Sequence, residues 1–101
     1  MIRHLVGWNL VATGEAERAS AVQTVREALE GLVGVVPGLL DLRVVENGAE
    51  IAGNSDLALI AHYATVDDLK AYIAHPAHLE AVGVVRANTT ERWAIDYEVV
   101  L

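Results

Sequence analysis

The sequence predicts an α+β fold in which four strands and two helical regions follow the order βαββαβ. Four segments alternate between two faces and are rich in β-branched and aromatic residues, as is typical of strands. The segments that join the first strand to the second, and the third to the fourth, carry apolar residues at three- and four-residue spacing, which predicts helices. This order is that of the ferredoxin-like split βαβ arrangement.

The first predicted strand spans residues 2–11. Its residues divide into a face with Ile2, His4, Val6, Trp8 and Leu10 and a face with Arg3, Leu5, Gly7, Asn9 and Val11. Because both faces are largely apolar, we expect this strand to be covered on both sides.

The first predicted helix begins near Glu15, with Thr13 as its capping residue, and the Pro37-Gly38 pair ends it. Its apolar stripe consists of Val22, Val25, Leu29, Leu32 and Val36. A second strand is predicted over residues 39–46, and a loop over residues 47–54 follows it.

The third predicted strand spans residues 56–64. Its faces carry Leu57, Leu59, Ala61 and Tyr63 on one side and Ala58, Ile60 and His62 on the other. Thr65 then caps a second helical region. This region breaks at His75-Pro76, because proline clashes with the preceding helical turn and biases the residue before it away from helical angles. Pro76 restarts the helix at its first position, and the helix continues to about Ala87.

The fourth predicted strand spans residues 91–100. Its faces carry Arg92, Ala94, Asp96 and Glu98 on one side and Trp93, Ile95, Tyr97 and Val99 on the other. Two helices cover only one face of such a sheet, and the other face would remain an apolar patch on a monomer. That patch contains Ile60, Trp93, Ile95 and Tyr97. We therefore expect a homodimer in which a second copy covers this face.

The composition narrows the class of protein. A length of 101 residues predicts a single domain over residues 1–101. The net charge of −7 argues against nucleic acid and anionic membranes as partners. The chain has no cysteine, which excludes disulfides and thiolate metal sites. No apolar run reaches the roughly 20 residues of a membrane span, and the N-terminus lacks signal-peptide features, so we expect a soluble, cytoplasmic protein.

The segment Tyr-Ile-Ala-His-Pro-Ala-His at residues 72–78 holds the main candidates for chemistry. The proline break places His78 in the first turn of a new helix, close to unpaired backbone N–H groups. His75 precedes the proline and is expected to act as a cap. The two histidines have a spacing that can bind metal, but the break removes the regular helical face that would aim both at one ion. We therefore expect no metal site.

Four segments together resemble the stress-responsive A/B barrel domain (Dabb) family: residues 1–6, 36–39, 72–78 and 96–97. The resemblance implies a ferredoxin-like unit that dimerises through its sheet into an α/β barrel. It also implies a relationship to a plant polyketide cyclase of that family, which needs no cofactor and closes a linear polyketide by an aldol reaction. The functional residues of that cyclase match His4, Tyr72, His78 and Asp96. Leu29 stands where the cyclase has a pocket tyrosine, so its substrate is not carried over.

In this interpretation His78 is the base, Asp96 sets its tautomer, and Tyr72 donates its hydroxyl to a carbonyl oxygen. The backbone N–H groups of Ala77 or His78 and the side chain of Arg92 are further candidates to stabilise that oxygen. Two plainer interpretations stay open. His78 can be a capping or core histidine bonded to Asp96, and Tyr72 can be an interior aromatic residue with a satisfied hydroxyl.

A pocket beside these groups would be lined by the candidate binding residues His4, Val6, Trp8, Leu29, Leu59, Ile73 and Arg92. For His4, a buried and hydrogen-bonded histidine is the favoured interpretation, and a polar group of the pocket is the other. His62 is expected in the dimer barrel rather than at the catalytic site.

Three functions remain as hypotheses. The first is a cofactor-independent cyclase or lyase-type enzyme that uses His78 as general base on a hydrophobic, oxygenated small molecule. The second is a cofactor-free monooxygenase, because antibiotic-biosynthesis monooxygenases have a similar dimeric barrel. The third is a stress-related or ligand-binding dimer without catalysis.

Overall fold

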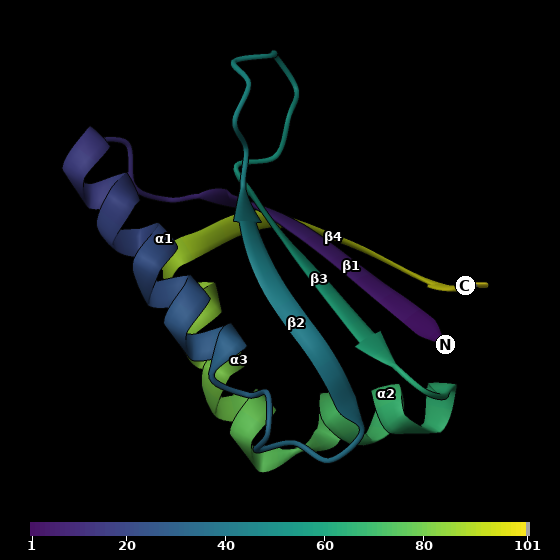
Figure 1. Ribbon diagram of the computed structural model, residues 1–101. Helices are drawn as coiled ribbons and strands as arrows, with labels where there is room; N and C mark the ends of the chain where they lie inside the picture. The colour runs from purple at the N-terminus through teal and green to yellow at the C-terminus, as the bar shows by residue number, and fades with distance from the viewer. Residues whose placement is uncertain (101) are drawn as a thin grey trace.

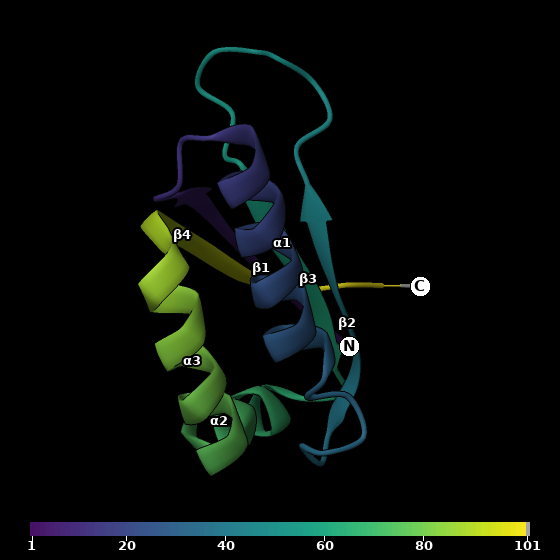
Figure 2. The same ribbon diagram turned by 90° about the vertical axis from the view of Figure 1, so that its left-hand side faces the viewer.

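A computed structural model describes residues 1–100, and its four strands form one antiparallel sheet in the order β2-β3-β1-β4. The elements are β1 (Ile2–Leu10), α1 (Glu15–Glu30), β2 (Leu39–Glu46), β3 (Leu57–Tyr63), α2 (Val66–Ala74), α3 (Pro76–Asn88) and β4 (Thr89–Glu98). The three helices lie on one side of the sheet (Figures 1 and 2). The predicted ferredoxin-like α+β fold is therefore confirmed.

The core lies between the helices and one face of the sheet. The predicted inward face of the third strand is buried along its whole length, and Ala61 and Tyr63 are completely inaccessible. From α1, Val25 is equally inaccessible, and it packs in the same cluster. The strict alternation of buried residues in β3 follows from the two-residue period of a strand.

The opposite face of the sheet is not covered by any element among residues 1–100. Trp93, Ile95 and Tyr97 of β4 are 44%, 52% and 37% exposed on that face. The Trp93 indole lies over Gly7 of β1, and a Cβ atom on Gly7 would come within 2.1 Å of the indole nitrogen. Glycine therefore allows the ring to lie flat on the sheet, where its N–H donates to the Ser55 hydroxyl over 2.8 Å.

A row of polar side chains crosses all four strands on this open face. Asp41 of β2 accepts a hydrogen bond from His62 Nδ1 of β3 over 2.6 Å. Arg3 of β1 donates from Nε to His62 Nε2 and from Nη1 to the Tyr97 hydroxyl of β4, each over 2.9 Å. We call Asp41, His62, Arg3 and Tyr97 the polar row. Its members are hydrogen-bonded to one another, and apolar side chains lie on either side of the row.

The first helix differs from its prediction at both ends. It ends at Glu30 rather than at Pro37-Gly38, because Gly31 caps it and Gly34 takes a left-handed conformation with φ of +84°. Hydrogen-bonded turns after Gly31 still bring Leu32 and Val36 into the core, which preserves the apolar stripe. At the other end Gly14 is the N-cap instead of Thr13, and no side chain caps the helix.

The fourth strand begins at Thr89, directly after α3, rather than at Glu91. Glu91 has a φ of +53°, and the pairing of β4 with β1 shifts register between Gly7 and Asn9. An irregularity of this kind is a β-bulge, which bends the strand and lets it start two residues earlier than the alternation indicates. Residues 47–54 form the predicted loop between β2 and β3.

Asp56 joins the start of β3 to two other elements. Its carboxylate accepts a hydrogen bond from the backbone N–H of Leu10 over 2.8 Å and forms an ion pair with Arg18 of α1 over 2.9 Å. Burial favours the protonated carboxyl, but the Leu10 N–H and the Arg18 charge outweigh it and hold the pKa of Asp56 below its ordinary value of 3.8.

We predict that Asp56→Ala lowers the free energy of unfolding by about 1–3 kcal/mol, because it leaves the N–H of buried Leu10 without a partner. Urea denaturation at pH 7 measures this loss. The pKa of Asp56 is lower in the folded protein than in the unfolded chain. The stability that ionised Asp56 provides is therefore fully present above pH 3.8, and it is lost as the pH falls through the folded-state pKa. Glu50→Ala in the exposed loop is the control, and an equal loss in the two variants would contradict the assignment.

Candidate functional site

The helix break occurs at the predicted residue and has a defined geometry. His75 ends α2 and caps α3, with extended backbone angles of φ −68° and ψ 135°. Pro76 is the first residue of α3, where its missing N–H costs nothing. The His75 Nδ1 atom accepts a hydrogen bond from the backbone N–H of Ala77 over 3.0 Å. The predicted capping role of His75 is therefore confirmed.

The break brings together four rings from four elements. The Tyr72 ring of α2 and the His78 ring of α3 have centroids 4.3 Å apart. Tyr63 of β3 lies 5.1 Å from Tyr72, and His4 of β1 lies 6.3 Å from Tyr63 and 6.4 Å from Tyr72. We call these four residues the four-ring cluster. All are titratable or can donate a hydrogen bond, and they meet under the helix break.

The cluster becomes more accessible from its inner to its outer end. Tyr63, Tyr72 and His4 are 0%, 1% and 5% exposed, whereas His78 is half-buried. Burial raises the pKa of Tyr72 to about 12, although Tyr63 acts in the opposite direction. Burial also raises the pKa of Tyr63, and the neighbouring Tyr72 adds to this rise. Both phenols therefore keep their protons at neutral pH and can act as hydrogen-bond donors.

Asp96 contacts His4 and not His78, which corrects the predicted pair. In the register of β1 and β4, His4 and Asp96 lie directly opposite each other, and the His4 Nδ1 atom bonds to the Asp96 carboxylate. Residues opposite each other in adjacent strands are closer than either is to a helix packed above the sheet. The structure confirms the favoured interpretation of His4 as a buried, hydrogen-bonded histidine.

His78 has a different partner. Its Nδ1 atom lies 3.1 Å from the carbonyl oxygen of Ile73 in the last turn of α2. A carbonyl can only accept, so Nδ1 carries the proton and Nε2 holds the lone pair of the neutral ring. The alternative of His78 as a histidine bonded to Asp96 is therefore wrong. Instead, the ring links the two helices on either side of the break.

The surroundings of His78 favour its neutral form. Burial lowers its pKa below the ordinary value of 6.5, although the Ile73 carbonyl acts in the opposite direction. The charge of Arg92 lowers the pKa further. A neutral imidazole with Nε2 unprotonated at pH 7 is the form that can accept a proton.

The helix-facing side of β4 remains open at the outer end of the cluster. Arg92, Ala94 and Asp96 alternate onto the side that carries His4 and Val6 in β1, and all three β4 residues are exposed. The Asp96 side chain is 42% exposed although it bonds to buried His4. The charge of Arg92 acts on His78 across this open side. Arg92, Ala94 and Asp96 are therefore in contact with solvent on the side of the sheet that carries His4.

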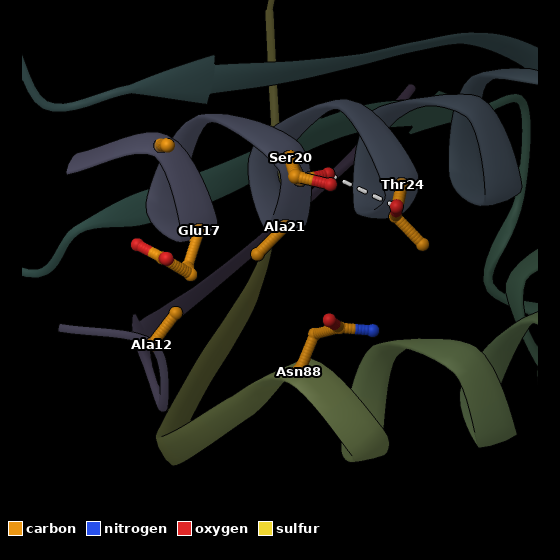
Figure 3. A pocket seen from close by; sticks show the side chains of 7 residues that line it. Ala12, Glu17, Ser20, Ala21, Thr24 and Asn88 are labelled. Carbon is orange, nitrogen blue, oxygen red and sulfur yellow. Dashed lines mark hydrogen bonds between the residues drawn. The ribbon is translucent and has the colours of Figure 1, made fainter. Parts of the chain in front are cut away.

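The other predicted binding residues fall into two groups. Val6, Trp8, Leu29 and Leu59 belong to the hydrophobic core, and Ile73 is 47% exposed on α2. Their contact with a ligand stays a prediction. A surface hollow of about 450 Å³ lies elsewhere, between the first turns of α1 and the last turn of α3 (Figure 3). Its lining is Ala12, Ala16, Glu17, Ser20, Ala21, Thr24 and Asn88, none of which belongs to the four-ring cluster.

Tyr63 belongs to the cluster but was not among the predicted site residues. It appeared only as one of the residues on the inward face of the third strand. Its hydroxyl is the one polar side-chain group in that row, since its companions are Leu57, Leu59 and Ala61. The hydroxyl of a buried tyrosine usually has a hydrogen-bond partner. A tyrosine on an otherwise apolar inward face was therefore the feature of the sequence that could have identified Tyr63.

The family of the chain is shown by its sequence. Residues 2–99 match the model of the stress responsive A/B barrel domain, so the chain belongs to that family. No curated protein matches the sequence. Among residues 1–100, no helix combines the length and apolarity that crossing a membrane requires. Within the same residues, no group of three or more His, Asp or Glu side chains is arranged to hold a metal ion.

Solved structures with the same fold are similar over nearly the whole chain. A dimeric protein of unknown function from Bacteroides fragilis is 24% identical, with a TM-score of 0.85 and coverage of 97% of this chain and 95% of the other. A dimeric ferredoxin-like protein from Thermobifida fusca is 26% identical, with a TM-score of 0.78 and coverage of 97% and 90%. SnoaB, a cofactor-independent oxygenase from Streptomyces nogalater, is 14% identical, with a TM-score of 0.71 and coverage of 99% and 93%.

We predict that His78 titrates below pH 6.5 in the folded protein, as measured by NMR of its ring protons. Between its lowered pKa and 6.5 the unfolded chain binds more protons, so the free energy of unfolding rises with pH in that interval. Arg92→Gln should raise the pKa of His78 but leave it below 6.5, because burial is the larger cause.

Arg43→Gln on β2 is the control, since it removes the same charge from an outward-facing position. An equal change of the His78 pKa in both variants would mean that net charge, rather than the position of Arg92, governs the titration.

Proposed function

We propose that this member of the stress responsive A/B barrel domain family is a cofactor-independent acid–base enzyme for hydrophobic, oxygenated small molecules. The observation that carries the proposal is the setting of His78. Its ring is neutral at pH 7, its Nδ1 is held by Ile73, and it lies 4.3 Å from the ring of Tyr72. A base beside a protonated phenol is what the removal of a proton next to a carbonyl group requires.

In the proposed reaction His78 Nε2 removes a proton from the carbon next to a carbonyl group of the substrate. The electron pair of the broken C–H bond moves onto the carbonyl oxygen, and the Tyr72 hydroxyl donates a hydrogen bond to the developing enolate. For a substrate with a second carbonyl, the enolate carbon forms a bond to that carbonyl carbon. The second oxygen then takes the proton from the His78 imidazolium, so the base returns to its neutral form.

Arg92 and the pair of His4 with Asp96 support this assignment electrostatically. The exposed Arg92 guanidinium lies on the side of β4 that faces His78, where it opposes a second positive charge and attracts an enolate. The Asp96 carboxylate is engaged by His4, so it does not stabilise the protonated form of His78. His78 is therefore a weak base in the ground state but is unprotonated and available at neutral pH.

A cofactor-free oxygenase is the second candidate. It is favoured by the structural similarity to SnoaB, a cofactor-independent oxygenase, which extends over 99% of this chain. The same neutral base could deprotonate a phenolic substrate, and the phenolate would then react with molecular oxygen. Oxygen consumption in the presence of a phenolic substrate distinguishes this candidate, because the carbon-acid reaction consumes none.

We also propose that two copies associate through the open face of the sheet. Trp93 and Ile95 form an exposed apolar strip there, beside the polar row, whose members are hydrogen-bonded to one another. Similar structures from Bacteroides fragilis and Thermobifida fusca are described as dimeric. A surface of apolar and internally paired polar groups can be buried without leaving unsatisfied charges.

The enzymatic proposal is tested with acetophenone, whose methyl protons exchange slowly in neutral D₂O without a catalyst. We expect the protein to accelerate this exchange, measured by ¹H NMR, and His78→Ala to lower the rate at least about 100-fold, the effect typical of losing a general base. Tyr72→Phe should lower it at least about 10-fold, since one donor to the enolate is lost.

Tyr97→Phe on the open face is the matched control for Tyr72→Phe, and His62→Gln is the control for His78→Ala. Exchange that persists in His78→Ala would contradict the role of the base. A wild-type protein that does not accelerate exchange would favour the ligand-binding alternative. In that case core residues such as Leu29 and Leu59 would pack too closely to admit a substrate to the cluster.

Sedimentation at micromolar concentration tests the association of two copies. We expect the mass of a dimer for the wild-type protein and of a monomer for Ile95→Glu, because a charge on the apolar strip would be buried without a partner. Leu79→Glu on α3 is the control, since Leu79 is 58% exposed on the helical side. A monomeric wild-type protein, or a Leu79→Glu variant that also dissociates, would contradict the proposed interface.

A further inference from the structure

The hydroxyl of Tyr63 is completely buried and makes no hydrogen bond with any residue among 1–100. Among these residues it is the only buried side-chain polar atom without a partner. Buried polar groups are nearly always hydrogen-bonded, because desolvation without compensation costs free energy. Phenylalanine would fill the same space without that cost. The hydroxyl therefore calls for an explanation outside the packing of the core.

The position of this hydroxyl points to the four-ring cluster. The Tyr63 ring is 5.1 Å from Tyr72 and 6.3 Å from His4. Tyr72 raises the pKa of Tyr63 and Tyr63 lowers that of Tyr72, which indicates that the two hydroxyl groups lie close together, although not in the geometry of a hydrogen bond. The charge of Asp96 also reaches Tyr63 and raises its pKa. The unpaired hydroxyl thus lies beside the phenol that serves as the donor in the proposed reaction.

We propose that the Tyr63 hydroxyl is a second hydrogen-bond donor to the substrate oxygen, so that Tyr63 and Tyr72 together form a two-phenol site for a carbonyl or enolate oxygen. This inference rests on the proposed function and deepens it, because it defines what the site recognises. In this proposal the Tyr63 hydroxyl donates a hydrogen bond to the oxygen atom of the bound ligand.

The chemistry of two adjacent phenols determines the class of ligand. A carbonyl oxygen has two lone pairs and can accept two hydrogen bonds, whereas an ether or a hydrocarbon of the same shape offers weaker acceptors or none. Both hydroxyls keep their protons at neutral pH, since burial raises both pKa values. A site that is built to donate hydrogen bonds rejects an analogue without the acceptor, because its buried donors then stay unpaired. The site should therefore select ketones and related carbonyl compounds over hydrocarbons.

The test compares two probes of the same shape. Acetophenone carries a carbonyl oxygen, and α-methylstyrene carries a CH₂ group in its place. Dissociation constants are measured by ¹H–¹⁵N NMR titration of the wild-type protein, of Tyr63→Phe and of the control Tyr97→Phe, which removes a hydroxyl that bonds to Arg3 on the open face. We expect the wild-type protein and the control to prefer acetophenone, and Tyr63→Phe to reduce this preference by about 10-fold.

The midpoint of thermal unfolding provides a readout that needs no ligand. Tyr63→Phe should unfold at the same temperature as the wild-type protein or a few degrees higher, because it removes an unsatisfied buried group. A decrease of several degrees would mean that the hydroxyl is bonded in the ligand-free protein, for example to an ordered water, and would overturn the inference.

The binding results separate this inference from the proposed function. An unchanged preference for acetophenone in Tyr63→Phe, or no preference in the wild-type protein, would overturn the two-phenol site even if His78-dependent proton exchange is observed. Conversely, a preference that depends on Tyr63 would support the two-phenol site even if the protein did not catalyse exchange, and the proposed enzymatic function alone would then fail.

Discussion

The interruption of the helix at Pro76 is the constraint on which the rest of the site depends. In a continuous helix, residues six positions apart are turned by about 240° and separated by about 9 Å along the axis, so Tyr72 and His78 would face different directions. The extended backbone of His75 changes this direction, and the two rings meet at 4.3 Å. The same break allows the Ile73 carbonyl to accept a hydrogen bond from His78 across the gap between two helices.

Pairing in the sheet determines the electrostatics around that break. The Asp96 carboxylate lies opposite His4 and is bonded to it, so its charge acts at the inner part of the cluster. Had it contacted His78, it would have favoured the imidazolium and opposed the effect of burial. Instead burial lowers the pKa of His78, and the charge of Arg92 lowers it further, so His78 stays neutral. The pair of buried His4 with partly exposed Asp96 and the separate half-buried His78 are thus two distinct elements of one site.

The two faces of the sheet have separate roles. The inward side chains of β1 and β3 provide the apolar core and place His4 and Tyr63 beneath the helix break. The outward side chains form the polar row and the exposed strip of β4, which lie away from the proposed chemistry. Because side chains alternate along each strand, association through one face and acid–base chemistry on the other can coexist in a small domain.

Local patterns in the sequence predict the order of the elements, the faces of the strands, the break at His75-Pro76 and the family, because alternation, proline geometry and motif spacing depend on neighbouring residues alone. They predict the end of the first helix wrongly, since the turns after Gly31 keep the apolar residues buried and so imitate a longer helix. The partner of Asp96 and the membership of Tyr63 in the cluster could not be predicted in this way. Both depend on strand register and on how the helices pack on the sheet, which bring together residues more than 50 positions apart in the chain.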